Sequence, residues 1–164
     1  MHTRRKLMIA CALLACSTVA LSADTVMVYV SSQTGQDDYL LSAVEAGVMD
    51  VFFDSGHIVF NAGTYERISD SDIQRRYWIR NTARQGGATL AMEIEVDLQP
   101  YNNRGADSGE RLFADAAAFR LIRIEPAEVL ESGAITAQRP PSQAERDTAA
   151  FELGIRIARA VLEP

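Results

Sequence analysis

The first half of the chain alternates short apolar runs with longer helical patterns. Residues 25–31 are apolar and β-branched on both faces, which predicts a strand in the middle of a sheet. After Asp37, apolar side chains return every three or four residues as far as Phe52, and this spacing predicts a helix that Gly56 ends. Residues 57–61 then predict a second strand.

A second helical pattern follows a polar turn region. It runs to about residue 85, where Gly86 and Gly87 end it. We expect Ile73, Tyr77 and Trp78 to be the apolar anchors that hold this helix against the rest of the protein.

The third predicted strand has the clearest pattern in the chain. Its apolar row is formed by Leu90, Met92, Ile94, Val96 and Leu98. The other row contains three acids, Glu93, Glu95 and Asp97. A period of two predicts that one row faces the core while the acidic row faces water, and a solvated face favours antiparallel pairing.

The remaining residues predict a polar loop, two more strands and a closing helix. The strands cover residues 111–124 and 128–137, and Ser142 with Glu145 forms a capping-box pattern before the last helix. We expect the buried side of this helix to consist of Phe151, Ile155, Ala158 and Leu162. The order is therefore β-α-β-α-β-β-β-α. It predicts an α/β (α+β) fold with a single mixed sheet of about five strands packed with three helices.

The N-terminal residues have the order of a secretory signal peptide. Three cations in the first six residues precede an uncharged apolar run that ends at Ala23. A membrane-spanning helix needs about 20 strongly apolar residues, and this run is shorter and contains serine and threonine. We expect residues 1–23 to be a signal peptide and residues 24–164 to form a single α/β domain.

Cys16 offers a second cleavage site. The letters LLAC resemble a bacterial lipobox, in which residues 1–15 would be removed and Cys16 would be acylated. The apolar continuation STVALSA favours the ordinary cut after Ala23, because lipoproteins usually place a polar tether there. We therefore favour a periplasmic or exported protein. A membrane-anchored lipoprotein, touching the membrane only through a lipid on Cys16, is the alternative.

Charge and cysteine content narrow the function classes. Both cysteines, Cys11 and Cys16, lie in the leader, so the body has no disulfide and depends on its core. Removing Arg4, Arg5 and Lys6 from the 16 basic residues leaves 13 against 22 acidic ones, and 13 − 22 gives a net charge of −9. Nucleic-acid binding needs a basic patch, so we expect no nucleic-acid partner.

The acidic strand is the strongest candidate for chemistry. Glu93, Glu95 and Asp97 are spaced about 6.6 Å apart along one face. Carboxylates at such spacing can serve as acid and base or hold a hard metal ion. The outward row of any half-exposed strand looks the same, so we interpret it as a solvated face.

Other reactive side chains are scarce in the body. His57 is its only histidine, and zinc normally needs three or four Cys or His ligands. No G-x-S-x-G, Walker or dinucleotide-binding spacing of glycines occurs. We interpret His57 as a surface or packing residue and expect no cofactor.

Two segments have the composition of binding surfaces. Residues 75–80, RRYWIR, interleave cations with aromatic side chains, which are enriched at binding hot spots. The polar loop 101–109 is the second candidate. On a helix Tyr77 or Trp78 must pack inward, so we favour core packing beside solvated charges for residues 75–80, with a partner surface as the alternative. In that alternative and in the loop, the residues that contact a partner are Arg76, Tyr77, Trp78, Arg80, Tyr101, Asn102 and Arg104.

The order of elements resembles that of bacterial envelope accessory domains. The resemblance is carried by ARQGGATLAMEIEVD, by the strand pair FRLIRIEPAEVLESGAI and by the closing ERDTAAFELGIRIARAVLE. Periplasmic activators of penicillin-binding proteins, the curli secretion-channel protein and the amino-terminal domain of TolB share this order. The resemblance implies an α/β fold, no catalytic residues and a protein-binding role at the envelope.

We therefore expect a non-enzymatic exported adaptor that binds an envelope protein or copies of itself. One alternative is a small metal-dependent hydrolase that uses Glu93, Glu95 and Asp97. Another is a subunit of an envelope secretion assembly.

Overall fold

The computed structural model describes residues 23–32, 38–63, 71–100 and 112–163. The predicted leader with Cys16, and the loop residues Tyr101, Asn102 and Arg104, lie outside the described residues. The elements are β1 (Thr25–Ser32), α2 (Asp38–Asp54), β2 (Ile58–Asn61), α3 (Asp72–Gln85), β3 (Leu90–Pro100), β4 (Leu112–Arg123), β5 (Glu128–Thr136) and α4 (Arg146–Leu162), with a 3₁₀ turn, η1 (Gln143–Glu145), before the last helix. The predicted order β-α-β-α-β-β-β-α is confirmed.

The five strands form one mixed sheet in the order β2-β1-β3-β4-β5. Strand β1 pairs in parallel with both β2 and β3, while β3, β4 and β5 pair antiparallel. Because β1 lies between two strands and under helices on both faces, Val26, Met27 and Val28 are completely buried. The prediction that residues 25–31 form a central, doubly covered strand is confirmed.

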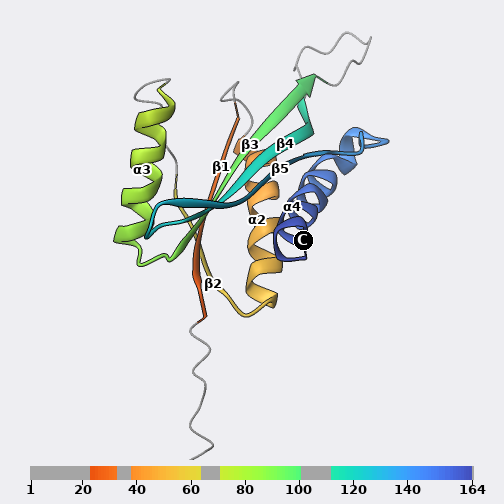
Figure 1. The fold of residues 1–164 in the computed structure, drawn as a ribbon. Coiled ribbons are helices and arrows are strands. Elements are labelled where there is room, and N and C mark those ends of the chain that lie inside the picture. The colour runs from red at the N-terminus through yellow and green to blue at the C-terminus, as the bar shows by residue number, and fades with distance from the viewer. Residues whose placement is uncertain (1–22, 33–37, 64–70, 101–111, 164) are drawn as a thin grey trace, which may run out of the picture.

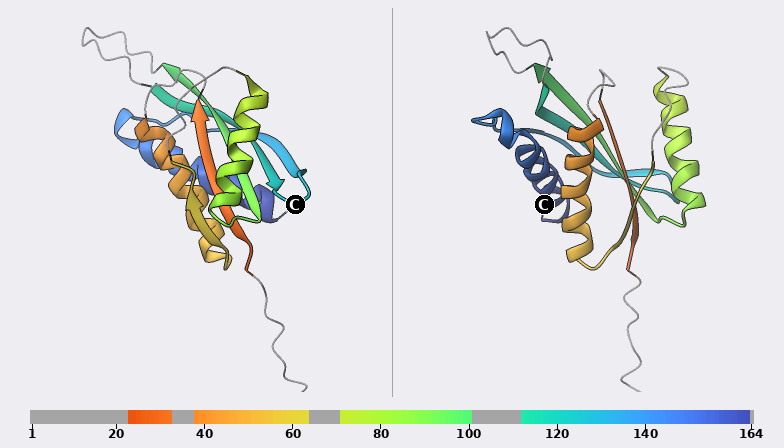
Figure 2. Two further views of the ribbon diagram at one scale, coloured as in Figure 1. Left: turned by 90° about the vertical axis from the view of Figure 1, so that its left-hand side faces the viewer. Right: turned by 180° about the vertical axis from the view of Figure 1, so that it is seen from behind.

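The helices lie on opposite sides of the sheet, with α2 and α4 together on one face and α3 on the other (Figures 1 and 2). The larger core lies under α2 and α4, where Met92, Ile94 and Val96 of β3 meet Val44 and Ile157 of the helices. A smaller core lies under α3. Its members are Met27, Tyr29, Ile79, Ala83, Ala88, Ala91 and Ile124.

Two glycines bring α2 and α4 into backbone contact. A Cβ atom added to Gly154 would overlap the carbonyl oxygen of Val44, and one added to Gly47 would overlap the carbonyl oxygen of Phe151. This contact sets the rotation of α4, whose buried residues are Ala150, Leu153, Gly154, Ile157, Ala158 and Val161. The expected buried side was therefore wrong for Phe151, Ile155 and Leu162, which lie beside it and are only partly buried.

The start of α4 also differs from the predicted capping box. The Ser142 hydroxyl donates to the Glu145 carboxylate at 2.8 Å, so the two side chains do meet. Ser142 does not accept a cap hydrogen bond through its side chain, and residues 143–145 form the 3₁₀ turn before the helix begins at Arg146. A 3₁₀ turn, and not a side-chain cap from Ser142, therefore precedes α4.

The acidic row of β3 is not uniformly solvated. Helix α3 covers the first part of that face, so Glu93 is only 4% exposed, whereas Asp97 lies beyond the helix and is exposed. The expectation of a solvated face was wrong for Glu93, because β3 pairs in parallel with β1 on one side and the parallel part of the sheet is covered on both faces.

His57 lies at the entrance to β2. Its ring packs edge-on against Phe52, with 5.5 Å between ring centroids, which agrees with a packing role. None of the helices in the described ranges is both long enough and apolar enough to cross a membrane.

Candidate functional site: the surface of helix α3

Helix α3 concentrates positive charge on an otherwise acidic protein. Its sequence, DIQRRYWIRNTARQ, contains four arginines and one aspartate. Only two of its side chains, Ile79 and Ala83, are fully buried against the sheet. Few side chains of α3 are buried against the sheet. Strand β1 supplies two large side chains to the core beneath the helix, Met27 and Tyr29.

A buried ion-pair network holds α3 to the sheet. Arg120 of β4 lies directly opposite Glu93 of β3 and donates from Nη2 at 2.7 Å and from Nε at 3.1 Å to Glu93 Oε2. From the helix, Arg75 Nε lies 3.3 Å from Glu93 Oε1, without the alignment of a hydrogen bond. Arg75 also pairs with Asp72 at 2.7 Å and approaches Glu95 at 3.8 Å. Two guanidinium groups thus neutralise the buried carboxylate of Glu93.

Sequence reasoning did not identify this network. Arg120 lies within the apolar run AAAFRLIR, where a charged side chain next to buried neighbours is a signal that a partner of opposite charge lies across the strand. Glu93 is the matching signal on β3. The sequence does not reveal the register of β3 and β4, which places Glu93 and Arg120 opposite each other.

The predicted contact residues of α3 divide between its two sides. Arg76 is exposed and Tyr77 is 69% exposed, so both face solvent. Trp78 turns inward and packs edge-on against Tyr29, with 5.3 Å between ring centroids. Arg80 is half-buried, and its Nε is hidden from solvent without a hydrogen-bond partner in the described chain.

The anchors expected for this helix were wrong for two of three residues. Ile73 is 80% exposed and Tyr77 is 69% exposed. The two lie four residues apart and therefore share one face of the helix. Together with Arg76 they form an apolar and cationic outer surface.

The acidic row does not converge on one point. Alternate residues of a strand project in parallel, and Glu93 is already held by Arg75 and Arg120. Within the described ranges, no group of three or more His, Cys, Asp or Glu side chains could hold a metal ion. Because both oxygens of Glu93 face arginines, this carboxylate is not free to contact a substrate.

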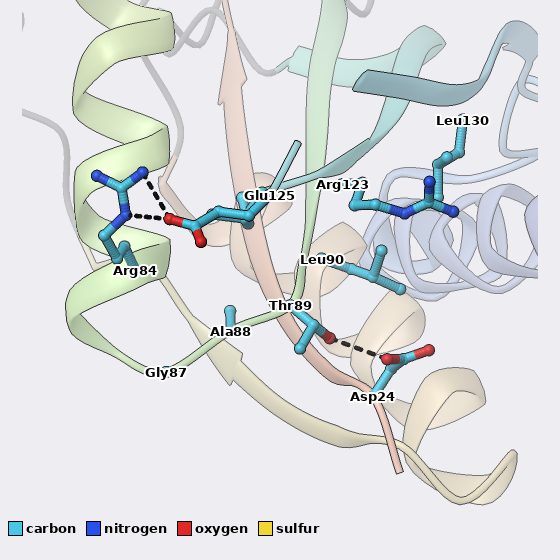
Figure 3. Close-up of a pocket in the computed structure, with 10 residues that line it drawn as sticks. Asp24, Arg84, Gly87, Ala88, Thr89, Leu90, Arg123, Glu125 and Leu130 are labelled. Carbon is cyan, nitrogen blue, oxygen red and sulfur yellow. Dashed lines mark hydrogen bonds and ion pairs between the residues drawn. The ribbon is translucent and has the colours of Figure 1, made fainter. Parts of the chain in front are cut away.

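A shallow hollow lies at the foot of the sheet, where α3 ends and β4 turns into β5 (Figure 3). Its volume is about 500 Å³. Arg84 pairs with Glu125 across it at 2.9 Å, and Thr89 donates to Asp24 at 3.0 Å (Figure 3). Its lining contains two arginines, Arg84 and Arg123, and two carboxylates, Asp24 and Glu125, so the hollow offers little net charge to a ligand.

Helix α2, on the opposite face, has the reverse charge. Its sequence, DYLLSAVEAGVMDVFFD, contains four acids and no basic residue. Burial raises the pKa of Glu45, and a hydrogen bond from Asn61 partly offsets this rise. Two aromatic side chains stand out from the helix, with Tyr39 at 76% and Phe53 at 71% exposure.

No family model matches the chain, and no curated protein matches it in sequence. Solved structures do match. A variant of the PelC dodecamer from Paraburkholderia phytofirmans is 15% identical, with a TM-score of 0.53 over 87% of this chain and 90% of that chain. Protein XCC0632 from Xanthomonas campestris is 13% identical, with a TM-score of 0.50 over 87% of this chain and 82% of that chain.

TolB from Acinetobacter baumannii is also similar. It is 10% identical, and the match covers 86% of this chain and 28% of that chain with a TM-score of 0.44, which is too low to carry an argument. At these identities the similarity establishes the fold alone. The α/β fold implied by the resemblance to envelope accessory domains is therefore confirmed, whereas membership of a particular family stays a prediction.

Proposed function

We propose that this protein is a non-enzymatic, exported envelope protein that acts by binding another protein through the outer surface of α3. One observation carries the proposal. Helix α3 is fixed from beneath by a buried ion-pair network, yet it exposes Ile73, Arg76 and Tyr77 together. Exposed apolar side chains beside an arginine are typical of protein-binding surfaces.

Contacts on the inner side of α3 support this proposal. Arg75 holds the helix through Glu93, and Trp78 packs against Tyr29. A surface that is already ordered loses little conformational entropy when it binds, so more of the contact energy appears as affinity. Trp78 then supports the surface from its inner side more than it contacts the partner.

The metal-dependent hydrolase is the weaker alternative. It requires Glu93, Glu95 and Asp97 to act on a common ligand, but Glu93 is buried and bound to two arginines. Asp97 lies further along the strand and is exposed. These positions favour a structural role for Glu93.

Export and location belong to the same proposal. The leader 1–23 directs the chain out of the cytoplasm, and the domain from Asp24 onward works in the periplasm or outside the cell. Acylation of Cys16 is the alternative, which would leave the same domain tethered to a membrane. The proposed partner is an envelope protein or a second copy of this chain. PelC is a protein of similar fold.

Site-specific photo-crosslinking tests the proposal. The only lysine of the chain is Lys6, in the predicted leader, so amine-reactive crosslinkers are unsuitable for the body. We would place a photoreactive phenylalanine at position 77 and, in a matched variant, at position 159 on the exposed side of α4. The full chain would be expressed with its own leader and irradiated in intact cells.

We expect position 77 to give a discrete protein adduct that position 159 does not give. Replacing Arg76 with alanine in the same chain should weaken the adduct, because the arginine lies beside Tyr77 on the outer surface. If position 77 gives no adduct, or both positions give the same set, the proposed binding surface on α3 is wrong. Mass spectrometry of the adduct also identifies the mature N-terminus.

A further inference from the structure

One stripe of residues on α2 and one on α3 are complementary in charge and similar in extent. On α3 the stripe consists of Ile73, Arg76, Tyr77 and Arg80, which an ideal helix places within an arc of about 100° over a length of about 10 Å. On α2 the stripe consists of Ala46, Asp50, Phe53 and Asp54, within an arc of about 100° over about 12 Å. The α3 stripe thus combines two cations with two large apolar side chains, and the α2 stripe combines two anions with one, Phe53.

Among the residues that the structure describes, the charges of both stripes have no ion-pair partner. In the described ranges, no carboxylate forms an ion pair with Arg76 or Arg80, although Arg75 and Arg84 of the same helix are both paired. Helix α2 contains no basic residue, and Asp50 and Asp54 are exposed without an ion pair to any described arginine. Of the four arginines of α3, Arg75 and Arg84 are therefore paired within the described chain, and Arg76 and Arg80 are available to a partner.

The apolar side chains of both stripes are also exposed to solvent. Phe53 on α2 is 71% exposed, and Ile73 and Tyr77 on α3 are 80% and 69% exposed. These are among the most exposed large apolar side chains in the described ranges. Burying them against each other would remove apolar area from water, at about 25 cal/mol per Å².

We propose that α3 of one copy docks against α2 of the next copy, so that the cationic stripe of one meets the acidic stripe of the other. The inference rests on the proposed function and names its partner as a second copy of this chain. Both complementary stripes belong to one polypeptide, which favours a copy over an unrelated protein. Opposite charges across the contact also fix its register and disfavour pairing of like with like.

The placement of the stripes determines the type of assembly. Helices α2 and α3 lie on opposite faces of the sheet (Figure 2). A single copy therefore offers one stripe on each side, and two copies cannot satisfy both stripes by a two-fold axis. The contact is head-to-tail, which generates a ring when the rotation closes and a filament when it does not.

A charge-swap experiment tests this arrangement. One variant carries Arg76→Glu and Arg80→Glu, and the other carries Asp50→Arg and Asp54→Arg. The chain is expressed with its own leader, purified, and studied by sedimentation velocity at low and high salt. A control variant reverses two exposed charges of α4, Glu152→Arg and Arg159→Glu, away from both stripes.

We expect the wild type and the control to sediment as species larger than a dimer, and each stripe variant to sediment as a monomer. Like charges across a contact cost several kcal/mol, so self-association should weaken by about a hundredfold or more. An equal mixture of the two stripe variants should assemble again, because the acidic α3 of one then faces the basic α2 of the other. Raising the salt concentration should weaken the wild-type assembly.

Because Arg80 is half-buried, a variant with Arg76→Glu alone serves as a second test, and thermal melting of the monomers checks that each variant is folded. The inference is wrong if the wild type is monomeric, if the stripe variants assemble like the wild type, or if their mixture stays monomeric. A monomeric wild type that still gives a photo-adduct with a different protein from position 77 would remove this inference and leave the proposed function standing.

Discussion

Replacing Gly154 with alanine tests the contact that joins α2 to α4. A Cβ atom at this position would overlap the carbonyl oxygen of Val44 and lie 3.0 Å from the backbone nitrogen of Val48. Both are backbone atoms of α2, so no side chain can move aside to make room. The helices must separate by about an ångström to bring the methyl group to ordinary contact, which begins at 3.4 Å.

Separating the helices lowers the stability of the fold because it disturbs the core side chains on either side of Gly154. Leu153 and Ile157 flank Gly154 and are completely or almost completely buried in the larger core. Overpacking a dense core by one methyl group typically costs about 1–3 kcal/mol, and a rigid backbone obstacle places this site near the upper end. Alanine recovers about 1 kcal/mol of helix propensity relative to glycine. We therefore expect a net loss of about 2 kcal/mol in the free energy of unfolding.

Urea denaturation followed by circular dichroism measures this difference, and for a domain of this size the melting temperature should fall by about 6–10 °C. Ser42→Ala on the exposed side of α2 is the control and should stay within about 0.5 kcal/mol of the wild type. If Gly154→Ala is as stable as the wild type, the two helix backbones do not touch and Gly154 does not set the rotation of α4.

Two further predictions concern the carboxylates. Glu93→Gln should lower the free energy of unfolding by about 3 kcal/mol, since it leaves Arg75 and Arg120 facing a neutral amide. The control, Glu128→Gln, breaks an exposed pair with Arg123 and should cost less than about 1 kcal/mol. Equal losses in the two urea titrations would contradict a buried network. Burial raises the pKa of Glu45, so the folded state binds its proton more tightly than the unfolded state, and its contribution to stability is lost as the pH rises through the range above the ordinary pKa of glutamate. Glu45→Gln should therefore gain stability relative to the wild type at pH 7 but not at pH 4, and a wild-type-like pH profile of the melting temperature would contradict this.

The fold could be predicted from the sequence because its strands and helices differ clearly in period. The apolar run of residues 25–31 and the alternation from Leu90 to Leu98 gave a buried strand and a half-buried one. Turn residues such as Gly56 and Gly87, which adopt positive φ angles of 86° and 73°, marked the ends of the helices. Each of these signals is local, so a single sequence is enough to find it.

The rotation of the helices could not be predicted from hydrophobicity. In α4 the bulky Phe151 and Ile155 suggested the wrong inner face, because the close contact of Gly154 with α2 decides the rotation. Glycines inside helical patterns, at 47 and 154, were the available signal. Each weakens its helix by about 1 kcal/mol, which usually has a packing reason.

The buried network and the outer surface of α3 depend on one another, and this explains why Tyr77, expected to anchor the helix, faces solvent instead. Successive residues of a helix are turned by about 100°, so holding Arg75 inward against Glu93 turns Arg76 and Tyr77 toward solvent. Size alone would have turned Tyr77 inward, since a large apolar side chain gains most from burial. The contact of Arg75 with Glu93 and the packing of Trp78 against Tyr29 override that preference and leave one aromatic ring exposed. An acidic residue on the strand thus determines which residues of the helix are available to a partner.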